Sequence, residues 1–347
     1  MKKLIPAAAL LVVLTLALSV TMPRAYLNQP LETGDAPATL IIKPGASLNS
    51  VARQLDERGW FRHPLMLRLY GRFSGTAEQI KAGEYVVPAG ITAIELVDLL
   101  VAGKVKLHAF TILEGWTARE MLAAISTTDT LEQTLVGSDA ETLAAELELD
   151  TDNAEGLFFP DTYHFPLGTT DRVLLLQAYA LMQQELAAAW EDRAQEGPLE
   201  NPYELLVLAS IVERESAVDA ERPEIAGVFV RRLNKGMRLQ TDPTVIYGLG
   251  TAFDGNLTRR HLRTDNPYNT YTRGGLPPTP IGMPGRSSLL ASAHPADGTA
   301  LYFVASGDED GGHVFSNTLE EHNKAVQDYL RKLRQASRRS KSTPEEG

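Results

Sequence analysis

The sequence contains no cysteine among its 347 residues. This absence excludes disulfides, thiolate metal sites and cysteine nucleophiles. Seven histidines are present, but none belongs to an HExxH motif or stands at another close ligand spacing, and there is no glycine-rich nucleotide-binding motif. The sequence therefore predicts neither a metal site nor a cofactor.

Positive charge is missing from one long stretch. Between Arg119 and Arg172 there are twelve Asp or Glu residues and no Lys or Arg, and the whole chain has a formal net charge of −11. Proteins that bind nucleic acids need basic surface for the phosphates. The charge distribution thus argues against nucleic acid as a partner, and we interpret the stretch as a solvated acidic subdomain.

One long apolar run is present at the N-terminus. Lys2 and Lys3 precede an uncharged segment from Leu4 to Pro23, and about twenty such residues can span a bilayer. The lysines are expected to stay cytoplasmic. Because the following "VTMPRAYLN" has no small-x-small cleavage site, an uncleaved anchor over residues 1–25 is favoured over a signal peptide. We therefore expect a single-pass protein of the inner (cytoplasmic) membrane, with a cytoplasmic N-terminus and its remaining domains in the periplasm.

A small α+β module is predicted after a polar linker at residues 26–38. Over residues 39–106 the pattern gives a strand ("TLIIKPG"), a helix with a serine cap ("SLNSVARQLDERG"), a second helix ("HPLMLRLYGRFSG"), another strand ("KAGEYVVPAG") and a final helix ("TAIELVDLLVAGK"). The segments "IIKPGASLNSVARQL" and "AGEYVVPAGITAIELVDLL" resemble a LysM-like fold. That resemblance implies a module of the kind often used on glycans of the bacterial wall.

The rest of the chain is predicted to form a larger α+β domain. Residues 107–154 are expected to be a connecting acidic subdomain with a strand and a helix capped by Thr117, and residues 155–333 the main domain. The main domain should contain a long helix from about Thr170 to Ala194, and a strand ("ALYFVAS") before a helix capped by Thr318. Residues 334–347 are charged and lack apolar periodicity, so a disordered tail is expected.

The stretch "IVERES" places two glutamates near the end of a helix that Asn201 and Pro202 should start. At 100° per residue, Glu215 lies inside the apolar arc of this helix and Glu213 lies on its far flank, roughly 200° away. A carboxyl group directed towards apolar surface has a raised pKa, which a general acid working near neutral pH requires. Position alone leaves open whether Glu215 is such an acid or the partner of a buried arginine.

Two later loops carry polar groups suited to sugars. "RRLNKGMRLQTDPTVIYGLG" and "DNPYNTYTRGGLPPTPIGMPG" combine amide, hydroxyl and carboxylate side chains with tyrosines and prolines. Amides and hydroxyls bond to sugar hydroxyls, and tyrosine rings cover apolar sugar faces. An irregular structural loop is the alternative.

The block from Glu155 to Leu330 resembles the catalytic domain of the endolytic murein transglycosylases, the YceG-like family. The resemblance is carried, in family order, by "EGLFFPDTY", "LASIVERES", "RLQTDPTVIYG", "YNTY", "GLPPTPI", "AHPA", "LYFV" and "HVFSNTLEEHN". Met283 departs from it, because a small polar residue is expected there. The resemblance implies cleavage of the β-1,4 bond between N-acetylmuramic acid and N-acetylglucosamine, leaving 1,6-anhydro ends, with Glu215 as acid and then base. Candidates for orienting this acid or gripping sugar are Glu213, Gln240, Asp242, Tyr247, Asn269 and Tyr271.

The resemblance also implies partners, namely the glycan strands of peptidoglycan and the penicillin-binding proteins that polymerise them, with the enzyme ending strand elongation. Two other functions remain open. One is a wall-binding scaffold without catalysis. The other is a lysozyme-like muramidase, in which Asp242 or Glu213 would be the second carboxylate.

Overall fold

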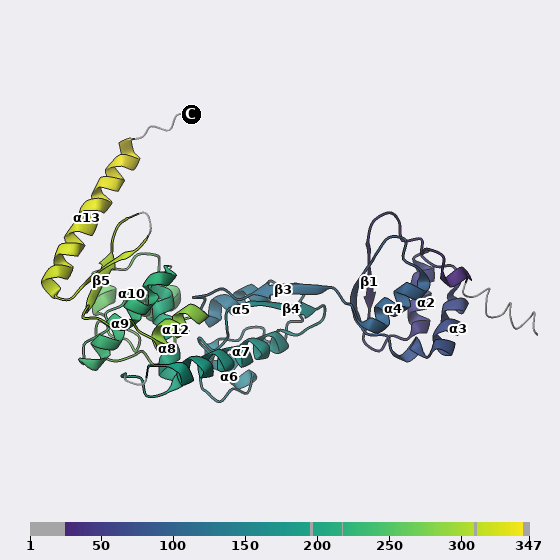
Figure 1. Ribbon diagram of the computed structural model, residues 1–347, viewed down its shortest axis with the longest axis horizontal. Helices are drawn as coiled ribbons and strands as arrows, with labels where there is room; N and C mark the ends of the chain where they lie inside the picture. The colour runs from purple at the N-terminus through teal and green to yellow at the C-terminus, as the bar shows by residue number, and fades with distance from the viewer. Residues whose placement is uncertain (1–24, 195–196, 217, 309–310, 343–347) are drawn as a thin grey trace, which may run out of the picture. The chain divides into compact units, whose positions relative to one another are not determined.

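The computed structural model describes residues 25–194, 197–216, 218–308 and 311–342 (Figure 1). The chain divides into two compact units. The first runs to Ala109 and includes His164–Thr169, and the second contains Phe110–Tyr163 and the chain from Thr170 onward. Within the described ranges no helix is both long and apolar enough to cross a membrane. The predicted anchor at residues 1–25 lies outside them, apart from its last residue.

The first unit is a two-stranded antiparallel sheet with helices. Strand β1 (Ala38–Ile42) pairs with β2 (Gly83–Val87), so that Leu40 lies opposite Tyr85. The helical elements are α2 (Leu48–Glu57), α3 (Pro64–Ser74), the 3-10 turn η1 (Thr76–Glu78) and α4 (Ala93–Ala102). The N-caps of α2 and α4 are Ser47 and Thr92, as the pattern predicts. The predicted α+β character of this segment is therefore confirmed.

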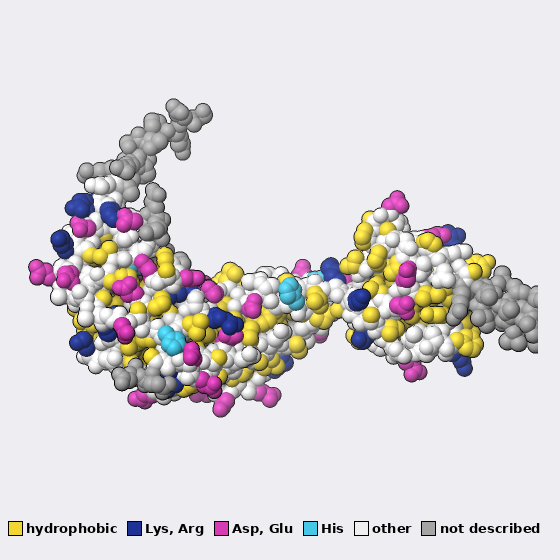
Figure 2. Space-filling view, viewed as in Figure 1, with side chains coloured by type: hydrophobic (Ala, Val, Ile, Leu, Met, Phe, Trp, Pro, Cys, Tyr) yellow, Lys and Arg dark blue, Asp and Glu magenta, His cyan; other side chains and the backbone are white. Residues whose placement is uncertain are grey.

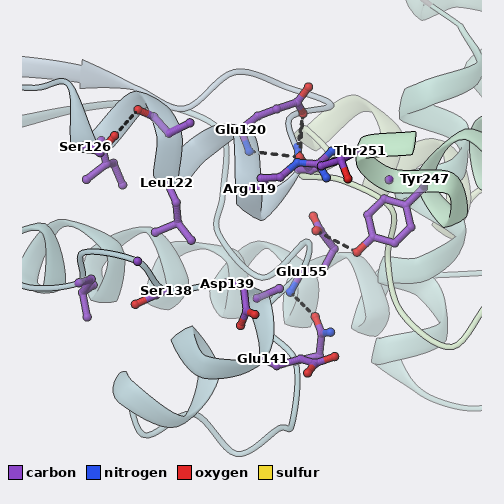
Figure 3. A pocket seen from close by; sticks show the side chains of 18 of the residues that line it. Arg119, Glu120, Leu122, Ser126, Ser138, Asp139, Glu141, Glu155, Tyr247 and Thr251 are labelled. Carbon is purple, nitrogen blue, oxygen red and sulfur yellow. Dashed lines mark hydrogen bonds between the residues drawn. The ribbon is translucent and has the colours of Figure 1, made fainter. Parts of the chain in front are cut away.

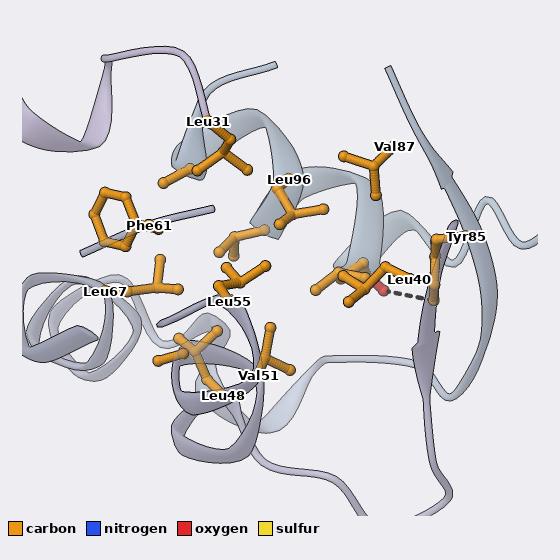
Figure 4. Close-up of a cluster of buried hydrophobic side chains, with 14 of the residues drawn as sticks. Leu31, Leu40, Leu48, Val51, Leu55, Phe61, Leu67, Tyr85, Val87 and Leu96 are labelled. Carbon is orange, nitrogen blue, oxygen red and sulfur yellow. Dashed lines mark hydrogen bonds between the residues drawn. The ribbon is translucent and has the colours of Figure 1, made fainter. Parts of the chain in front are cut away.

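The core of the first unit is mainly aliphatic and also contains the rings of Phe61 and Tyr85 (Figure 4). Alternate strand residues and one face of each helix point into it, because side chains alternate along a strand and recur every three to four residues on a helix. Gly71 allows α3 to lie against α2, since a Cβ at this position would come within 2.0 Å of Leu48 Cδ2. The close contact of these two helices therefore depends on that glycine.

The predicted linker at residues 26–38 is wrong for its first half. Leu27 and Leu31 are buried in the core of the first unit. The N–H of Leu31 donates to the carbonyl of Ile91 at 2.8 Å, and that of Glu32 donates to the carbonyl of Trp60 at 3.0 Å. Two leucines that bury fully supply the free energy that orders this otherwise polar segment.

The second unit is mainly helical. Strand β3 (Leu107–Thr111) pairs with β4 (Thr162–Pro166) where the chain passes between the units. The helices that follow are α5 (Ala118–Ser126), α6 (Ala140–Glu146), α7 (Asp171–Asp192), α8 (Pro202–Glu215), α9 (Arg222–Asn234), α10 (Asp242–Leu249), α11 (Arg259–Arg263) and α12 (Arg286–Ala293). A short 3-10 turn, η2 (Asp219–Glu221), precedes α9, and another, η3 (Gly250–Ala252), follows α10. Strands β5 (Tyr302–Ala305) and β6 (His313–Ser316) form an antiparallel hairpin.

Helix α8 lies at the centre of this unit. It packs against α7, α9, α10 and α12 (Figure 1), and every residue from Leu205 to Val212 is buried. The helix is therefore covered all round rather than along one arc. Its cap is the predicted one, because the Asn201 side chain accepts from the N–H of Glu204. The first turn, residues 202–204, and the last turn, residues 213–215, are less buried, and the last turn carries Glu213 and Glu215.

The C-terminal helix α13 extends over Leu319–Ser342. The N–H of Glu321 donates to Thr318 Oγ1 at 3.2 Å, which is the predicted cap. The chain is helical well beyond residue 333, where a disordered tail was predicted. Arg, Lys, Gln and Ala are good helix formers, so a charged segment continues a helix that is already capped and packed on β5 and β6.

Candidate functional site

Glu215 is the last residue of α8, and its carboxyl group is held by one side chain. The hydroxyl of Thr241 donates to Glu215 Oε1. Burial raises the pKa of Glu215 to about 7, and the nearby charge of Asp242 adds to the rise, while the Thr241 hydrogen bond opposes it. A carboxyl group with this pKa is present in both protonation states near neutral pH. It can therefore give up a proton and take one back in the same reaction.

A cluster of buried threonines fixes the hydroxyl that contacts Glu215. The N–H of Thr241 donates to Thr270 Oγ1 at 3.1 Å, and Thr244 Oγ1 donates to the Thr241 carbonyl at 2.8 Å. The hydroxyls of Thr244 and Thr270 lie 2.9 Å apart. All three threonines are buried. The Thr241 hydroxyl that donates to Glu215 is thus held in place by contacts within the protein.

Gln240 precedes this cluster in a strained backbone conformation. Its φ is 52°, in the left-handed region, and its side chain is exposed. A non-glycine residue held in this region costs about 1 to 3 kcal/mol and often marks a functional site. The N–H of Gln240 donates to the Thr270 carbonyl at 3.2 Å, which holds the turn.

Asp242 and Tyr271 form a pair beside Glu215. The Tyr271 hydroxyl donates to Asp242 Oδ1 at 2.6 Å. Asp242 is exposed and Tyr271 is half-buried, and the charges of Asp242 and Glu215 both raise the pKa of the Tyr271 hydroxyl, after its burial. The structure therefore brings Gln240, Asp242 and Tyr271 to the same side of the domain as Glu215.

Asn269 has a different position from the other candidates. It is fully buried, and its amide nitrogen donates to the carbonyls of His261, Leu262 and Thr264 at the end of α11. Its amide oxygen accepts from the N–H of Tyr271 at 2.9 Å. Asn269 consequently shapes the loop that carries Tyr271, and both ends of its amide are hydrogen-bonded within the protein.

Glu213 is fixed by two strong partners. Its Oε1 lies 2.9 Å from Arg222 Nη2, and its Oε2 accepts from the N–H of Gly285 at 2.9 Å. The side chains of Glu213 and Arg222 are each only 5% exposed, and Arg222 also contacts Asp219 at 3.3 Å. A buried carboxylate with a guanidinium and an amide as partners is a structural anchor. Glu213 therefore supports the end of α8, and each of its two carboxylate oxygens has a partner within the protein.

The sequence reasoning missed a second buried carboxyl group, Glu155. It is 2% exposed, and burial raises its pKa to about 7. Its oxygens accept from the N–H of Ala118 at 2.9 Å and from the hydroxyl of Tyr247 at 3.0 Å (Figure 3). Glu155 begins the motif "EGLFFPDTY", which was the available signal. Tyr247 is therefore tied to Glu155.

Glu155 and Tyr247 line a cavity of about 1000 Å³ (Figure 3). The rings of Tyr247 and Tyr268 meet edge to face with centroids 4.7 Å apart. The walls come from α5, the segments before and after α6, the end of α8, and α10 with η3, and they include Arg119, Asn153, Arg214, Thr251 and Phe253. Because α10 carries Asp242 at its start and Tyr247 further along, one short helix connects the surroundings of Glu215 with this cavity.

The loop "PIGMPG" closes on the end of α8. Met283 is fully buried, and its backbone exchanges two hydrogen bonds with residues 115 and 116, of 2.8 and 2.7 Å. Arg214 Nη1 donates to the Gly115 carbonyl at 2.7 Å. The methionine that departs from the expected motif therefore packs in the interior, where a side chain of this size has room, and the loop holds the residue next to Glu215.

The histidines near the site have carboxylate partners. His313 Nδ1 lies 2.8 Å from Glu221, and His294 Nε2 lies 3.1 Å from Asp192. Among the residues that the structure describes, no group of three or more His, Asp or Glu side chains could hold a metal ion.

The fold and the site define an α+β protein with a candidate acid–base residue, Glu215, at the end of a buried helix. The sequence model of the YceG-like family matches residues 40–328. The chain belongs to the YceG-like family, which confirms the resemblance found in the sequence.

Named relatives agree with this assignment. A Bacillus subtilis protein named endolytic murein transglycosylase is 31% identical over 307 residues, covering 83% of this chain and 84% of the relative. A Streptococcus pneumoniae protein of the same name is 27% identical over 333 residues, and this chain spans 58% of its length. The crystal structure of a yceG-like protein from Listeria monocytogenes is 28% identical, with a TM-score of 0.54 over 84% of this chain and 99% of that one.

Proposed function

We propose that the protein is an endolytic murein transglycosylase. It cleaves the β-1,4 bond between N-acetylmuramic acid and N-acetylglucosamine within glycan strands and leaves 1,6-anhydro-N-acetylmuramic acid ends. The observation that carries the proposal is the Glu215 carboxyl group, with its pKa of about 7 and the Thr241 hydroxyl that donates to it. The names of the relatives from Bacillus subtilis and Streptococcus pneumoniae support it.

One carboxyl group is sufficient for this reaction. Protonated Glu215 donates its proton to the glycosidic oxygen as the bond from that oxygen to muramyl C1 breaks. The resulting carboxylate accepts the proton of the muramyl C6 hydroxyl, whose oxygen bonds to C1. No water is consumed, and Glu215 is again protonated at the end. A paired nucleophile or base, as in most glycoside hydrolases, is not needed, which agrees with Glu213 being bound to Arg222 and Gly285.

The groups around Glu215 suit a sugar chain. Gln240 and the Asp242–Tyr271 pair offer an amide, a carboxylate and a phenol to sugar hydroxyls. The cavity beside Tyr247 has the size of known ligand sites and combines aromatic rings with polar side chains. We assign it to saccharide units that extend from the bond being cleaved.

The first unit and the N-terminus have supporting roles in this proposal. The unit is a LysM-like module that holds wall glycan, in keeping with its two antiparallel strands and the two helices between them. The apolar run from Leu4 to Pro23 is an anchor in the inner membrane, with the enzyme in the periplasm, where nascent strands and the penicillin-binding proteins that make them are found. The activity there ends strand elongation.

A lysozyme-like muramidase is the second candidate, because Asp242 lies near Glu215 and is exposed. Mass spectrometry of products from purified glycan strands separates the two functions, since an anhydro end is lighter than a reducing end by one water. We expect anhydro ends from the wild type and no products from Glu215→Gln. Reducing ends that disappear in Asp242→Asn would establish the muramidase. Equal products from wild type and Glu215→Gln would leave only a wall-binding scaffold.

A further inference from the structure

Helix α3 presents an apolar stripe to solvent. Leu65, Leu69 and Phe73 are 60%, 38% and 85% exposed. They are spaced by four residues and so lie along one side of the helix, while Leu67 and Gly71 are buried on the other side. Hydrophobic side chains reach the surface of the first unit in the region of α3 (Figure 2). Grouped exposure of large apolar side chains marks an interaction surface.

The stripe is bordered by positive charge. Arg68 and Arg72 are exposed, as is Arg62, which lies 3.6 Å from Glu32, and no Asp or Glu occurs from residue 62 to residue 73, although the whole chain has a net charge of −11. At 100° per residue, Arg68 and Arg72 lie directly beside Leu65. Arginines lay their apolar stems along such a surface and keep their charged ends in the polar layer. Apolar residues flanked by cations are typical of helices that lie in a membrane interface.

The first described residues of the chain lie next to α3. The ring of Tyr26 is 4.8 Å from that of His63, the N-cap of α3, and Leu27 is buried in the same unit. Tyr26 follows the apolar run that ends at Pro23 by only three residues. Tyr26 and Leu27, which follow this run in the sequence, are therefore held in the first unit, with Tyr26 against the start of α3, and the purple segment in Figure 1 marks this first described part of the chain.

We propose that α3 docks on an anionic lipid bilayer surface, with Leu65, Leu69 and Phe73 in the interface and with Arg68 and Arg72 against lipid phosphates. This inference rests on the run from Leu4 to Pro23 being a membrane anchor and is independent of the enzymatic activity. Docking gives the first unit a second attachment besides its tether, which fixes its orientation on the membrane.

Other occupants fit the surface less well. The described side chains of α3 from Leu65 to Phe73 include no amide or carboxylate to bond sugar hydroxyls. A stripe of three apolar side chains is small beside the roughly 800 Å² per partner of a stable interface between two copies. Positive charge on both copies would also oppose such a dimer.

The absence of native cysteine allows a clean test in the full-length protein. Single cysteines at Leu65→Cys and Phe73→Cys are labelled with an environment-sensitive fluorophore. Asn49→Cys, on an exposed position of α2, is the matched control. Each protein is reconstituted into phosphatidylcholine vesicles with or without phosphatidylglycerol. Flotation in alkaline carbonate measures anchor insertion separately, and thermal melting shows that each variant is folded.

We expect blue-shifted emission and quenching by lipid-borne spin labels at positions 65 and 73 but not at 49, and more so with phosphatidylglycerol. Arg68→Gln and Arg72→Gln should each lower the ratio of docked to undocked protein by about fivefold. Emission at 73 like that at 49 would refute docking. Suppose instead that the emission is blue-shifted, that lipid-borne quenchers do not reduce it, and that the shift grows with protein density. The surface would then be one that binds a second copy of the protein and not the membrane. A shift that appears only with added glycan strands would assign the surface to glycan.

Discussion

Glu213 and Glu215 occupy the same turn of α8, two residues apart, but their carboxyl groups have different partners. Glu213 is enclosed by Arg222 and the N–H of Gly285. Glu215 has one hydroxyl partner, and burial raises its pKa to about 7. The difference shows that burial alone does not make a glutamate an acid. For Glu215 the effect of burial outweighs the charges of Arg232 and His313, so its carboxyl group can carry a proton near neutral pH, whereas the carboxyl group of Glu213 contacts a guanidinium and a backbone amide.

The largest expected effect separates the two glutamates by activity. Removing a general acid typically lowers a rate by about 10² to 10⁴, so Glu215→Gln should reduce kcat for release of anhydro-ended fragments by this factor. Glu213→Gln should leave most of kcat in the protein that remains folded and should lower stability. Comparable losses of kcat in both variants, at temperatures where both are folded, would show that the two carboxylates act together.

The second prediction concerns the partner of Glu213. Arg222→Met leaves a buried carboxylate without its cation, which costs about 3 to 5 kcal/mol of unfolding free energy. Urea denaturation measures this loss. In the double variant Glu213→Gln/Arg222→Met no charge is stranded, so it should be more stable than Arg222→Met alone. Additive losses in the two single variants would show that the pair is not coupled.

Stability should depend on pH through Glu215. The folded state keeps the Glu215 proton up to about pH 7, whereas an unfolded glutamate releases it near pH 4.3. The folded state therefore binds more protons between these values, and stability falls as pH rises through that window, by up to about 3 kcal/mol. Glu215→Gln should remove this fall from urea denaturation series at pH 4 to 8. Glu213→Gln should retain it, together with the similar fall that Glu155 contributes.

Much of this contrast could be predicted from the sequence because it is local. Asn201 and Pro202 fix the start of α8, and helical geometry then separates Glu213 from Glu215. The partners could not be predicted, since Gly285 is 72 residues away and only the folded chain brings it to Glu213. Glu155 was missed for the same reason, because its donors Ala118 and Tyr247 are 37 and 92 residues distant.

The interpretation of residues 26–38 as a linker failed for a related reason. Prolines and polar residues dominate the segment, and the pattern does not show that two spaced leucines dock into a core formed by later residues. Asn269 is a similar case. Its residue type suits sugar recognition, but the three carbonyls of α11 that occupy its amide are defined only by the fold.

A smaller effect tests the hydroxyl that holds Glu215. The Thr241 hydrogen bond lowers the pKa of Glu215 against the effect of burial, so Thr241→Val should raise that pKa further. The alkaline limb of the kcat/KM profile then moves to higher pH, while the plateau falls severalfold because the acid is less well oriented. Thr244→Val, which keeps the donor to Glu215, is the control and should leave the limb in place. An unchanged limb in Thr241→Val would mean that this hydroxyl does not contact the ionising group in solution.

The smallest expected effect lies at Gln240, one residue before Thr241. Its φ of 52° is strained for glutamine but not for glycine. Gln240→Gly should therefore stabilise the protein by up to about 1 kcal/mol relative to Gln240→Ala, since the gain from released strain is partly offset by glycine's greater freedom in the unfolded chain. Both variants lack the amide, so both should raise KM for glycan strands to the same extent if that amide contacts sugar. Equal melting temperatures for the two variants would show that the backbone at residue 240 is not strained. A higher KM in Gln240→Gly alone would show that the backbone of this turn, rather than the glutamine amide, orders the part of the site beside Glu215.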